Sequence, residues 1–386
     1  MYFYSKYISV LILVISVLFM FVTGRDGIFS TMLDYGRTVD YTVIGTPLDS
    51  YFESNSRASI PWNMQIFEDK LYIGCGDYDA NSGPVPVLCY DLRDRVWCDE
   101  GELPDEQLNR FCIIDGKMVI PGTDPKEDWD MGNYYVWESD KWVMVRNIPG
   151  GIHNFDMTEF DGMVFAGLGV TETEYSIARS NDGGKSFSQV ALYKNGSPID
   201  TSDKSYIRTY DFLTLDGELY ATYYCVNNDG TSTYELYKYE GGEDGIFVYK
   251  CDLSKKLPYK KISYDLIRED IEYDGKLFIA TGSLYMTTDM DRFEVVKLPN
   301  CRRNIICDMY TDSGRLYVLS CYSKQDGQYK TIVWEYKDGG FTELFDFDYS
   351  IPCISFACKD SDFYIGMGNA SSQNEKNGAI IHVCSE

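Results

Sequence analysis

The sequence has 386 residues, of which 60 are acidic and 35 are basic, so its formal net charge is -25. Such a charge repels phosphate backbones and anionic lipid headgroups, which excludes nucleic acid as an expected partner; solubility is a second explanation for the excess of acid. Aromatic residues make up 15% of the chain, and glycine contributes 33 residues. Because this composition favours strands and turns over long helices, we expect an all-β protein.

The N-terminal segment is apolar. Lys6 precedes a run from Tyr7 to Val22 that is short for a membrane span and typical of a signal sequence. We therefore assign residues 1–24 to a signal peptide or signal anchor, residues 25–36 to a linker, and residues 37–386 to the folded domain. On this interpretation the protein is secreted, or is anchored in a membrane with an extracytoplasmic domain.

A two-strand phrase recurs along the rest of the chain, as in FDGMVFAGLGV from Phe160 and YDGKLFIATGS from Tyr273. The second turn residue of this phrase falls at Asp69, Gly116, Gly162, Gly217, Gly275, Gly314 and Asp362. The mean spacing is about 49 residues, a period that is typical of propeller blades with four strands each. The repeat therefore predicts a β-propeller.

A second periodic marker predicts how the ring closes. An aromatic residue just after a polar hairpin recurs seven times, and its first copy, Tyr41, precedes the first two-strand phrase. The chain thus begins with an outer strand and ends one strand short of a complete blade. We predict a seven-bladed β-propeller of four-stranded blades, in which the segment from Arg37 to Gly45 completes the last blade.

One turn carries a recognisable motif. The segment SNDGGKSF places Ser180, Asp182, Gly184 and Phe187 in the order Ser-x-Asp-x-Gly-x-Ser-Phe. This pattern resembles the Asp-box, or BNR repeat, of the sialidase-like β-propellers, and Thr287 with Asp289 and Phe293 is similar to a second copy. The resemblance implies that the box lies between the third and fourth strands of a blade, that its Asp bonds the backbone of its own turn, and that its role is structural.

The candidate ligand site lies where loops converge on the central channel. Five arginines fall near the start of innermost strands, and a histidine takes the comparable place in one more strand. A guanidinium bonds both oxygens of a carboxylate or phosphate, and exposed aromatic rings stack on sugars, so this mouth is suited to a glycan or a protein ligand. The candidate residues are Arg57, Trp62, Arg110, His153, Asn154, Asp156, Arg208, Tyr210, Arg268 and Arg303.

The same residues allow a second interpretation, in which each arginine pairs with a nearby acid such as Asp156, Asp211 or Glu269 and joins neighbouring blades. The aromatic residues would then pack between blades instead of binding sugar. His153 is one of only two histidines in the chain, so a zinc site has little support, and a hydrogen-bonding role in the channel is the simpler expectation for it.

A weak calcium motif is the only cofactor signal. Asp77, Asp79 and Asn81 alternate as in a calcium-binding loop, although the glycine at position 83 falls one residue later than in an EF-hand. The alternative is a solvated turn. We therefore expect no cofactor apart from a weakly bound calcium ion.

Twelve cysteines are scattered through the expected strands and form no compact disulfide framework. Cys89 with Cys98, and Cys307 with Cys321, flank hairpin turns at nearly equal distances, so each pair has the placement for a cross-strand bridge. We expect mostly free, buried thiols, because a small apolar thiol is common in cores.

Two functional classes remain open, and the sequence identifies no catalytic residue for either. The first is an exported or cell-surface binding module for a glycan or protein ligand, with an assembly scaffold as a variant of it. The alternative is a glycosidase or lyase of sialidase-like type that uses carboxylates and arginines at the channel mouth. Sialidases open with a Phe/Tyr-Arg-Ile-Pro motif, which the segment from Arg146 to Pro149 does not reproduce, so sialidase activity itself is not expected.

Overall fold

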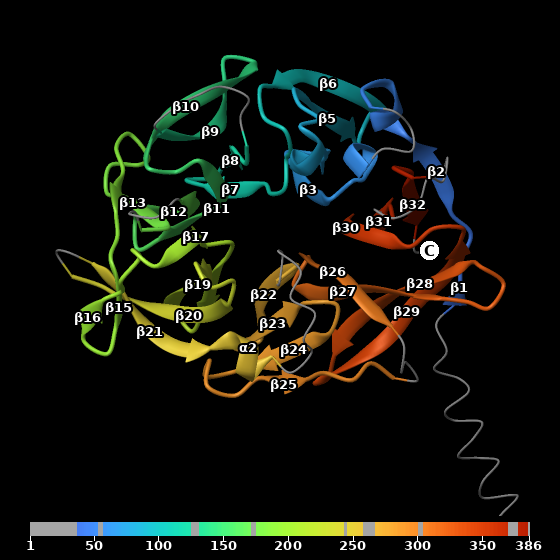
Figure 1. Ribbon diagram of the computed structural model, residues 1–386. Helices are drawn as coiled ribbons and strands as arrows, with labels where there is room; N and C mark the ends of the chain where they lie inside the picture. The colour runs from blue at the N-terminus through green and yellow to red at the C-terminus, as the bar shows by residue number, and fades with distance from the viewer. Residues whose placement is uncertain are drawn as a thin grey trace, which may run out of the picture.

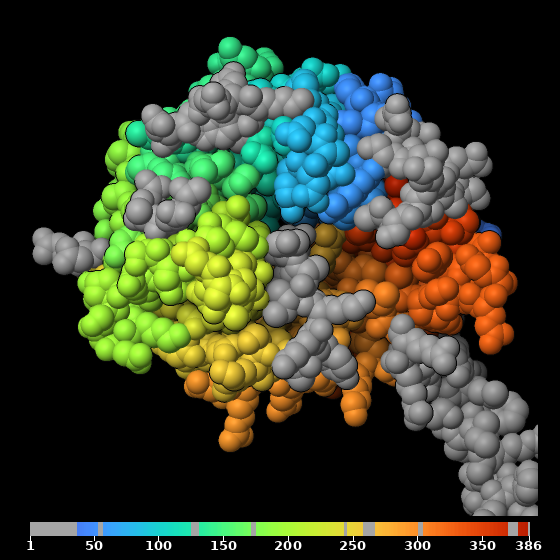
Figure 2. Space-filling model, in the orientation of Figure 1, coloured from blue at the N-terminus to red at the C-terminus, as the bar shows by residue number. Residues whose placement is uncertain are grey.

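The computed structural model describes residues 37–52, 57–124, 131–170, 175–242, 245–257, 267–299, 304–369 and 377–384. In this part of the chain, β-sheets are arranged around a central axis and form a β-propeller (Figure 1). The colours in Figure 2 follow the chain around the disc from blue through green and yellow to red. The predicted signal or anchor segment and the linker, residues 1–36, lie outside the described residues.

Five separate sheets each form one blade. Two of them contain consecutive strands from the first two-fifths of the chain: β3 (Asn63–Phe67), β4 (Lys70–Gly74), β5 (Val85–Asp91) and β6 (Val96–Leu103), then β7 (Cys112–Ile114), β8 (Lys117–Pro121), β9 (Met131–Glu138) and β10 (Lys141–Pro149). A third contains β22 (Glu269–Tyr273), β23 (Lys276–Ala280), β24 (Leu284–Thr287) and β25 (Glu294–Val295).

The last two blades include strands from the N-terminal end of the described chain. One contains β26 (Ile305–Asp312), β27 (Arg315–Ser323), β28 (Tyr329–Lys337), β29 (Gly340–Tyr349) and β1 (Arg37–Thr38). The other contains β30 (Cys353–Lys359), β31 (Asp362–Met367), β32 (Ile380–Cys384) and β2 (Thr42–Gly45).

The remaining strands form one continuous 11-stranded sheet. Its strands are β11 (His153–Phe160), β12 (Met163–Val170), β13 (Ile177–Ser180), β14 (Ser188–Gln189), β15 (Leu192–Lys194), β16 (Ser197–Pro198), β17 (Lys204–Arg208), β18 (Phe212–Leu215), β19 (Glu218–Asn227), β20 (Ser232–Glu240) and β21 (Ile246–Asp252). A short helix, α2 (Leu253–Lys256), follows β21, and three 3-10 turns, η1 (Pro47–Ser50), η2 (Arg57–Ser59) and η3 (Tyr78–Ala80), lie in the first quarter of the chain.

The prediction of seven four-stranded blades is therefore wrong. The structure has five separate blades, and the strands between β10 and β22 belong to a single sheet. They are joined because β17 pairs with β12 on one side and with β19 on the other, while β15 pairs in parallel with β21. The sequence repeat counts hairpins, and it carries no information on whether the segments between hairpins add further pairings.

The closure of the ring by the N-terminal segment is confirmed for β2, which pairs antiparallel with β32 and so completes the sheet of the last strands. The other half of the predicted segment behaves differently. β1 pairs in parallel with β29 of the neighbouring blade, with Arg37 opposite Phe345. The N-terminal segment thus bonds to two blades and covers an edge strand of each, which are edges that would otherwise be open to aggregation.

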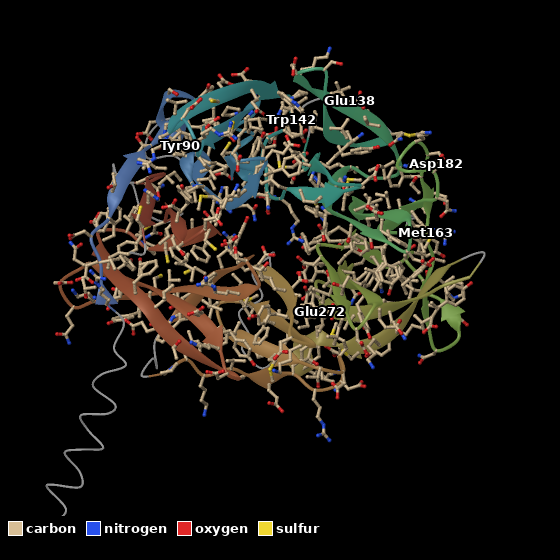
Figure 3. The ribbon with its side chains drawn as sticks, turned by 180° about the vertical axis from the view of Figure 1, so that it is seen from behind. Tyr90, Glu138, Trp142, Met163, Asp182 and Glu272 are labelled. Carbon is tan, nitrogen blue, oxygen red and sulfur yellow. The ribbon has the colours of Figure 1, made fainter. Side chains whose placement is uncertain are left out.

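The hairpins form because their turn residues accept a left-handed backbone. At the turn between β11 and β12, Asp161 and Gly162 have φ angles of 50° and 71°, as a type I′ turn requires. The strands on either side then contribute apolar side chains that pack between neighbouring sheets (Figure 3). At one such contact, Phe363 packs against Phe345 at 5.1 Å and stacks parallel to Phe356 at 6.1 Å between ring centroids.

The turn from Ser180 to Phe187 is held by its own polar groups. Asp182 accepts hydrogen bonds from the backbone nitrogen and the hydroxyl of Ser186, at 2.9 and 2.6 Å, and Ser180 Oγ accepts one from Gly184 N at 2.8 Å. These bonds hold the pKa of Asp182 low, at about 2. The turn joins β13 to β14 and lies at the outer edge of the disc, far from the channel (Figure 3). The corresponding turn at Thr287 and Asp289 makes similar bonds.

We predict that Ser180→Ala lowers the free energy of unfolding by about 1–3 kcal/mol, because it leaves the buried backbone nitrogen of Gly184 without its acceptor. Urea unfolding followed by fluorescence measures the change. Ser188→Ala, at an exposed position on β14, is the matched control and is expected to change stability little. Equal stability of the two variants would contradict this role of Ser180.

Candidate functional site

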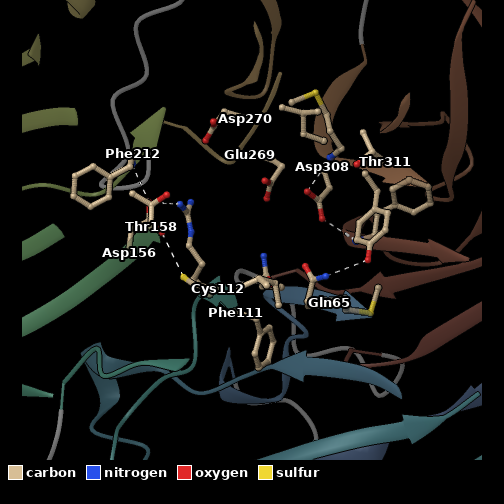
Figure 4. Close-up of a pocket in the computed structure, with 18 of the residues that line it drawn as sticks. Gln65, Phe111, Cys112, Asp156, Thr158, Phe212, Glu269, Asp270, Asp308 and Thr311 are labelled. Carbon is tan, nitrogen blue, oxygen red and sulfur yellow. Dashed lines mark hydrogen bonds and ion pairs between the residues drawn. The ribbon is translucent and has the colours of Figure 1, made fainter. Parts of the chain in front are cut away.

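A cavity of about 380 Å³ lies on the propeller axis (Figure 4). Its walls come from the innermost strands β3, β7, β11, β18, β22, β26 and β30. Phe111, Phe212 and Phe356 supply apolar wall, and acidic side chains reach into the space between them. The cavity therefore gathers residues that are far apart in the sequence at one place in the molecule.

Five charged side chains near this cavity form what we call the charged ring: Arg110, Asp156, Asp211, Glu269 and Asp308. Arg110 Nη1 lies 3.0 Å from Asp156 Oδ2, and its Nη2 lies 3.0 Å from Asp211 Oδ1. Burial raises the pKa of Glu269 and raises the pKa of Asp308 well above its usual value. The ring therefore combines a paired cation with carboxyl groups that resist ionisation.

Two β-bulges aim the aspartates of the ring. The register of β11 shifts between Asn154 and Asp156, and that of β26 shifts between Ile306 and Asp308. A bulge turns a side chain out of the regular alternation of its strand. The aspartates then accept backbone hydrogen bonds from the next innermost strand: Asp156 from Phe212 N at 2.9 Å, and Asp308 from Phe356 N at 2.8 Å.

A smaller cavity of about 70 Å³ forms the mouth of the channel, and it shares Arg110 with the central cavity. It brings together five of the residues predicted from sequence: Arg57, Trp62, Arg110, Tyr210 and Arg268. It also contains residues outside the list of ten candidates, namely Tyr78, Gln107, Asn109, Phe155, Asp211 and Ile267; of these, Asp211 was expected as a partner of an arginine. Five of the ten candidate residues therefore lie together at this cavity.

Phe155 connects two further candidates to the mouth. Its ring lies 4.6 Å from that of Tyr210 and 5.5 Å from that of His153, and the guanidinium of Arg208 lies 5.8 Å from its centroid. Arg208 also lies over Tyr206 at 4.9 Å. Phe155 and Tyr210 are thus in ring contact, and the guanidinium of Arg208 lies against both Phe155 and Tyr206. We call the three rings Phe155, Tyr206 and Tyr210 the aromatic platform.

The arginines of the mouth fall into two groups. Arg57 bonds Asp79 Oδ2 at 3.0 Å, and Arg110 is paired with two acids, as the blade-joining interpretation expects. Arg208 donates to the carbonyl of Ile207 at 3.0 Å, and Arg268 donates to those of Trp62 and Ile354 at 2.5 and 3.1 Å. Among the described residues, neither Arg208 nor Arg268 has a carboxylate within ion-pair distance.

The remaining candidates have different surroundings. His153 Nδ1 lies 2.5 Å from the carbonyl of Thr123, and burial together with the nearby Arg208 lowers the pKa of His153 to about 4. Asn154 is fully buried and donates to Asn133 O at 3.3 Å, so it supports the wall and does not face the mouth. Asp156 belongs to the charged ring. Arg303 lies outside the described residues.

The predicted calcium loop faces an arginine. Asp79 bonds Arg57 at 3.0 Å and Asp77 lies 4.0 Å from the same nitrogen, so a cation already stands beside both carboxylates. Asn81 has a left-handed backbone, with φ of 51°, and is exposed. Calcium at this loop stays a prediction.

Sequence reasoning named Arg110, Asp156, Asp211 and Glu269 as possible ion-pair partners, but it missed Asp308 and did not group the five residues, although the repeat holds a signal for the set. Arg110, Asp156, Asp211, Glu269 and Asp308 each lie six residues before the second turn residue of the following hairpin. Residues in the same phase of a repeat occupy the same level of the propeller. Asp270 was also missed, and it lies one residue out of this phase. Burial raises the pKa of Asp270 well above its usual value.

No protein-family model and no curated protein sequence matches the chain. Solved structures with a similar arrangement include a protein from Lactobacillus plantarum, with 12% identity, coverage of 78% of this chain and 89% of that chain, and a TM-score of 0.45. A chain of the mitotic checkpoint complex has 10% identity, 82% and 84% coverage, and a TM-score of 0.48. The β-propeller domain of the Trilobed protease from Pyrococcus furiosus has 12% identity, 74% and 83% coverage, and a TM-score of 0.41.

The sheets around an axis and the channel through them define the described part of the chain as a β-propeller. Among the described residues, no helix has the length and apolar character needed to cross a membrane.

A buried aspartate near His153 predicts a pH dependence of stability. Burial raises the pKa of Asp105 from 3.8 to about 6, so the folded state favours its protonated form. The stability that this protonation contributes is fully present below about pH 4 and is lost as the pH rises through 6. The total loss of unfolding free energy is about 3 kcal/mol. His153 acts in the opposite direction, because its lowered pKa makes folding less favourable as the pH falls from 6.5 to about 4.

We therefore predict that Asp105→Asn makes the change in unfolding free energy between pH 4 and pH 6 less negative by about 2 kcal/mol relative to the unmodified chain, which is the part of the whole effect that falls in this pH interval. Denaturant unfolding at several pH values measures the difference, in which the contribution of His153 cancels. Asp140→Asn, in an exposed turn, is the control. Parallel pH profiles for Asp105→Asn and the unmodified chain would show that Asp105 ionises normally.

Proposed function

We propose that the protein is an exported, Asp-box type β-propeller that binds a carbohydrate at the mouth of its channel, and that the sugar carries an acidic group. The observation that carries this proposal is the aromatic platform beside Arg208 and Arg268, whose guanidinium groups bond only backbone carbonyls among the described residues. Aromatic faces pack on sugar rings, while a guanidinium binds a carboxylate through two parallel hydrogen bonds.

Two further features support the proposal. The apolar run from Tyr7 to Val22 favours export, which is where a glycan-binding surface would meet its ligand. The turn from Ser180 to Phe187 supports an Asp-box relationship through its sequence and its hydrogen bonds. Because the net charge of -25 repels anions at long range, an acidic sugar would bind through the local arginines at the mouth, and binding would strengthen as salt screens that repulsion.

A glycan array probed with the purified protein identifies the ligand, and titration calorimetry then tests the site. We predict that Tyr210→Ala and Arg208→Gln each weaken binding about tenfold, because each removes one contact worth about 1.4 kcal/mol. Trp137→Ala is the matched control, since Trp137 is 37% exposed on β9 and packs against Trp142 away from the mouth. If Tyr210→Ala and Trp137→Ala weakened binding equally, the sugar would bind at another place.

The charged ring favours a second candidate function, hydrolysis of a glycosidic bond. This reaction uses one protonated and one ionised carboxyl group on opposite sides of the bond. Burial raises the pKa values of Glu269 and Asp308, which favours the protonated form, while Asp156 is paired with Arg110 in the same cavity. The central cavity therefore holds carboxyl groups suited to both roles.

If the protein hydrolyses the glycan that it binds, we predict that Glu269→Gln lowers the rate about 100-fold or more, the usual effect of removing a general acid. Release of reducing sugar measures the rate, and titration calorimetry measures binding by the same variant. Asp338→Asn, in the exposed turn between β28 and β29, is the control. Binding by the unmodified protein without any release of sugar would exclude the hydrolase and leave the binding module.

A further inference from the structure

Three cysteine side chains meet at the junction between the last two blades. Cys307 lies on β26, Cys321 on β27 and Cys353 at the start of β30. Their three Sγ atoms all lie within 4.8 Å of one another, and those of Cys307 and Cys321 are 3.6 Å apart. We call this group the thiol cluster. Its side chains are buried, with exposed fractions of 8%, 2% and 3%.

A β-bulge brings the cluster together. In the pairing of β26 with β27, Ile305 lies opposite Cys321 and Ile306 opposite Ser320, and the register then skips Cys307. The skipped residue has no direct partner on β27, so its side chain is free to turn toward Cys321 and toward β30. On β30 a second bulge follows directly after Cys353. Both irregularities fall where the thiols meet, and a regular ladder would not bring these three side chains together.

We propose that the thiol cluster is a site for a soft metal ion, with Cu(I) held by three sulfurs in trigonal geometry as its occupant. Thiolate ligands select soft ions such as Cu(I) over hard ones. With metal–sulfur distances near 2.3 Å, the sulfurs of a trigonal site are about 4 Å apart. The spacing of the three Sγ atoms already approaches this arrangement.

A positive charge lies beside the cluster. The guanidinium of Arg268 donates through Nε to the carbonyl of Cys307 at 3.4 Å, and it would offset part of the negative charge that a copper–thiolate centre carries. When Cu(I) binds, the three thiols lose their protons to solvent, three copper–sulfur bonds form, and no atom is oxidised or reduced.

The ligand set distinguishes Cu(I) from zinc. Structural zinc sites have four protein ligands, whereas the cluster has three among the described residues, and no histidine or carboxylate of those residues joins it. A disulfide between Cys307 and Cys321 would use two of the three sulfurs and leave Cys353 unexplained. All eleven cysteines in the described part of the chain are free thiols. The group Asp362, His382 and Cys384 is mixed in ligand type and only partly buried, so it is less suited to Cu(I).

The test is titration of the reduced, full-length chain with Cu(I) under argon against a chromophoric Cu(I) chelator. We expect a single Cu(I) ion to be retained, with about three sulfurs at about 2.3 Å in X-ray absorption. Cys307→Ala, Cys321→Ala and Cys353→Ala should each weaken retention about 100-fold or more. Cys358→Ala is the matched control, because Cys358 is equally buried on the same strand as Cys353 but lies outside the cluster.

A second measurement needs no variant and so does not depend on folding of the substituted chains. Cu(I) should protect Cys307, Cys321 and Cys353 from alkylation in the unmodified protein, as read by mass spectrometry, and leave the labelling of Cys98 and Cys384 unchanged. Failure of the protein to compete with the chelator would overturn the proposal. So would retention that survives all three substitutions, a Cys307–Cys321 disulfide in protein kept under argon, or preferential binding of zinc with four ligands.

Discussion

The ion pairs of Arg110 are the interaction on which the channel depends. The guanidinium is 21% exposed and bonds two aspartates from other strands, Asp156 and Asp211, whose side chains are 7% and 3% exposed. Removing one partner from such a buried pair leaves an uncompensated charge, which costs about 3–5 kcal/mol. The innermost strands all approach the axis, so carboxylates gather there whatever their function. Arg110 offsets the negative charges of Asp156 and Asp211. The raised pKa values of Glu269 and Asp308 favour the neutral forms of these two carboxyl groups.

Ring closure and channel geometry constrain each other. The innermost strands stay at the same height along the axis only if the first and last blades are held together. The pairings of β2 with β32 and of β1 with β29 hold them together. Bonds between neighbouring innermost strands hold them at the same height along the axis: Asp308 accepts from Phe356 N, and Asp156 accepts from Phe212 N. The carboxylates that line the cavity therefore also hold its walls in register, and their replacement affects stability and ligand binding together.

Much of the fold could be predicted from the sequence, because hairpin turns and alternating strands depend on local residue types. The all-β class, the propeller arrangement and the place of β2 follow from the repeat. The number of separate blades did not follow, because the pairing of β17 with both neighbours uses backbone groups that every residue carries. At the mouth, Arg57 was predicted from its place near a strand start, and Trp62 and Tyr210 were predicted as aromatic residues in the converging loops. Their partners, and the inward turn of Asp308 and Cys307 at a bulge, depend on register, which single residues do not encode.

The bulge in β26 links the two sites that the structure contains. It sends Asp308 toward the cavity and Cys307 toward the thiol cluster, and these two residues are adjacent in the chain. Arg268 joins the same two places, because its guanidinium lines the mouth and its Nε donates to the carbonyl of Cys307. If the cluster became more negative on binding a metal ion, it would attract the guanidinium of Arg268, which an acidic ligand would also bind. Since binding free energies are reciprocal, an ion in the cluster and a ligand at the mouth would then weaken each other through Arg268.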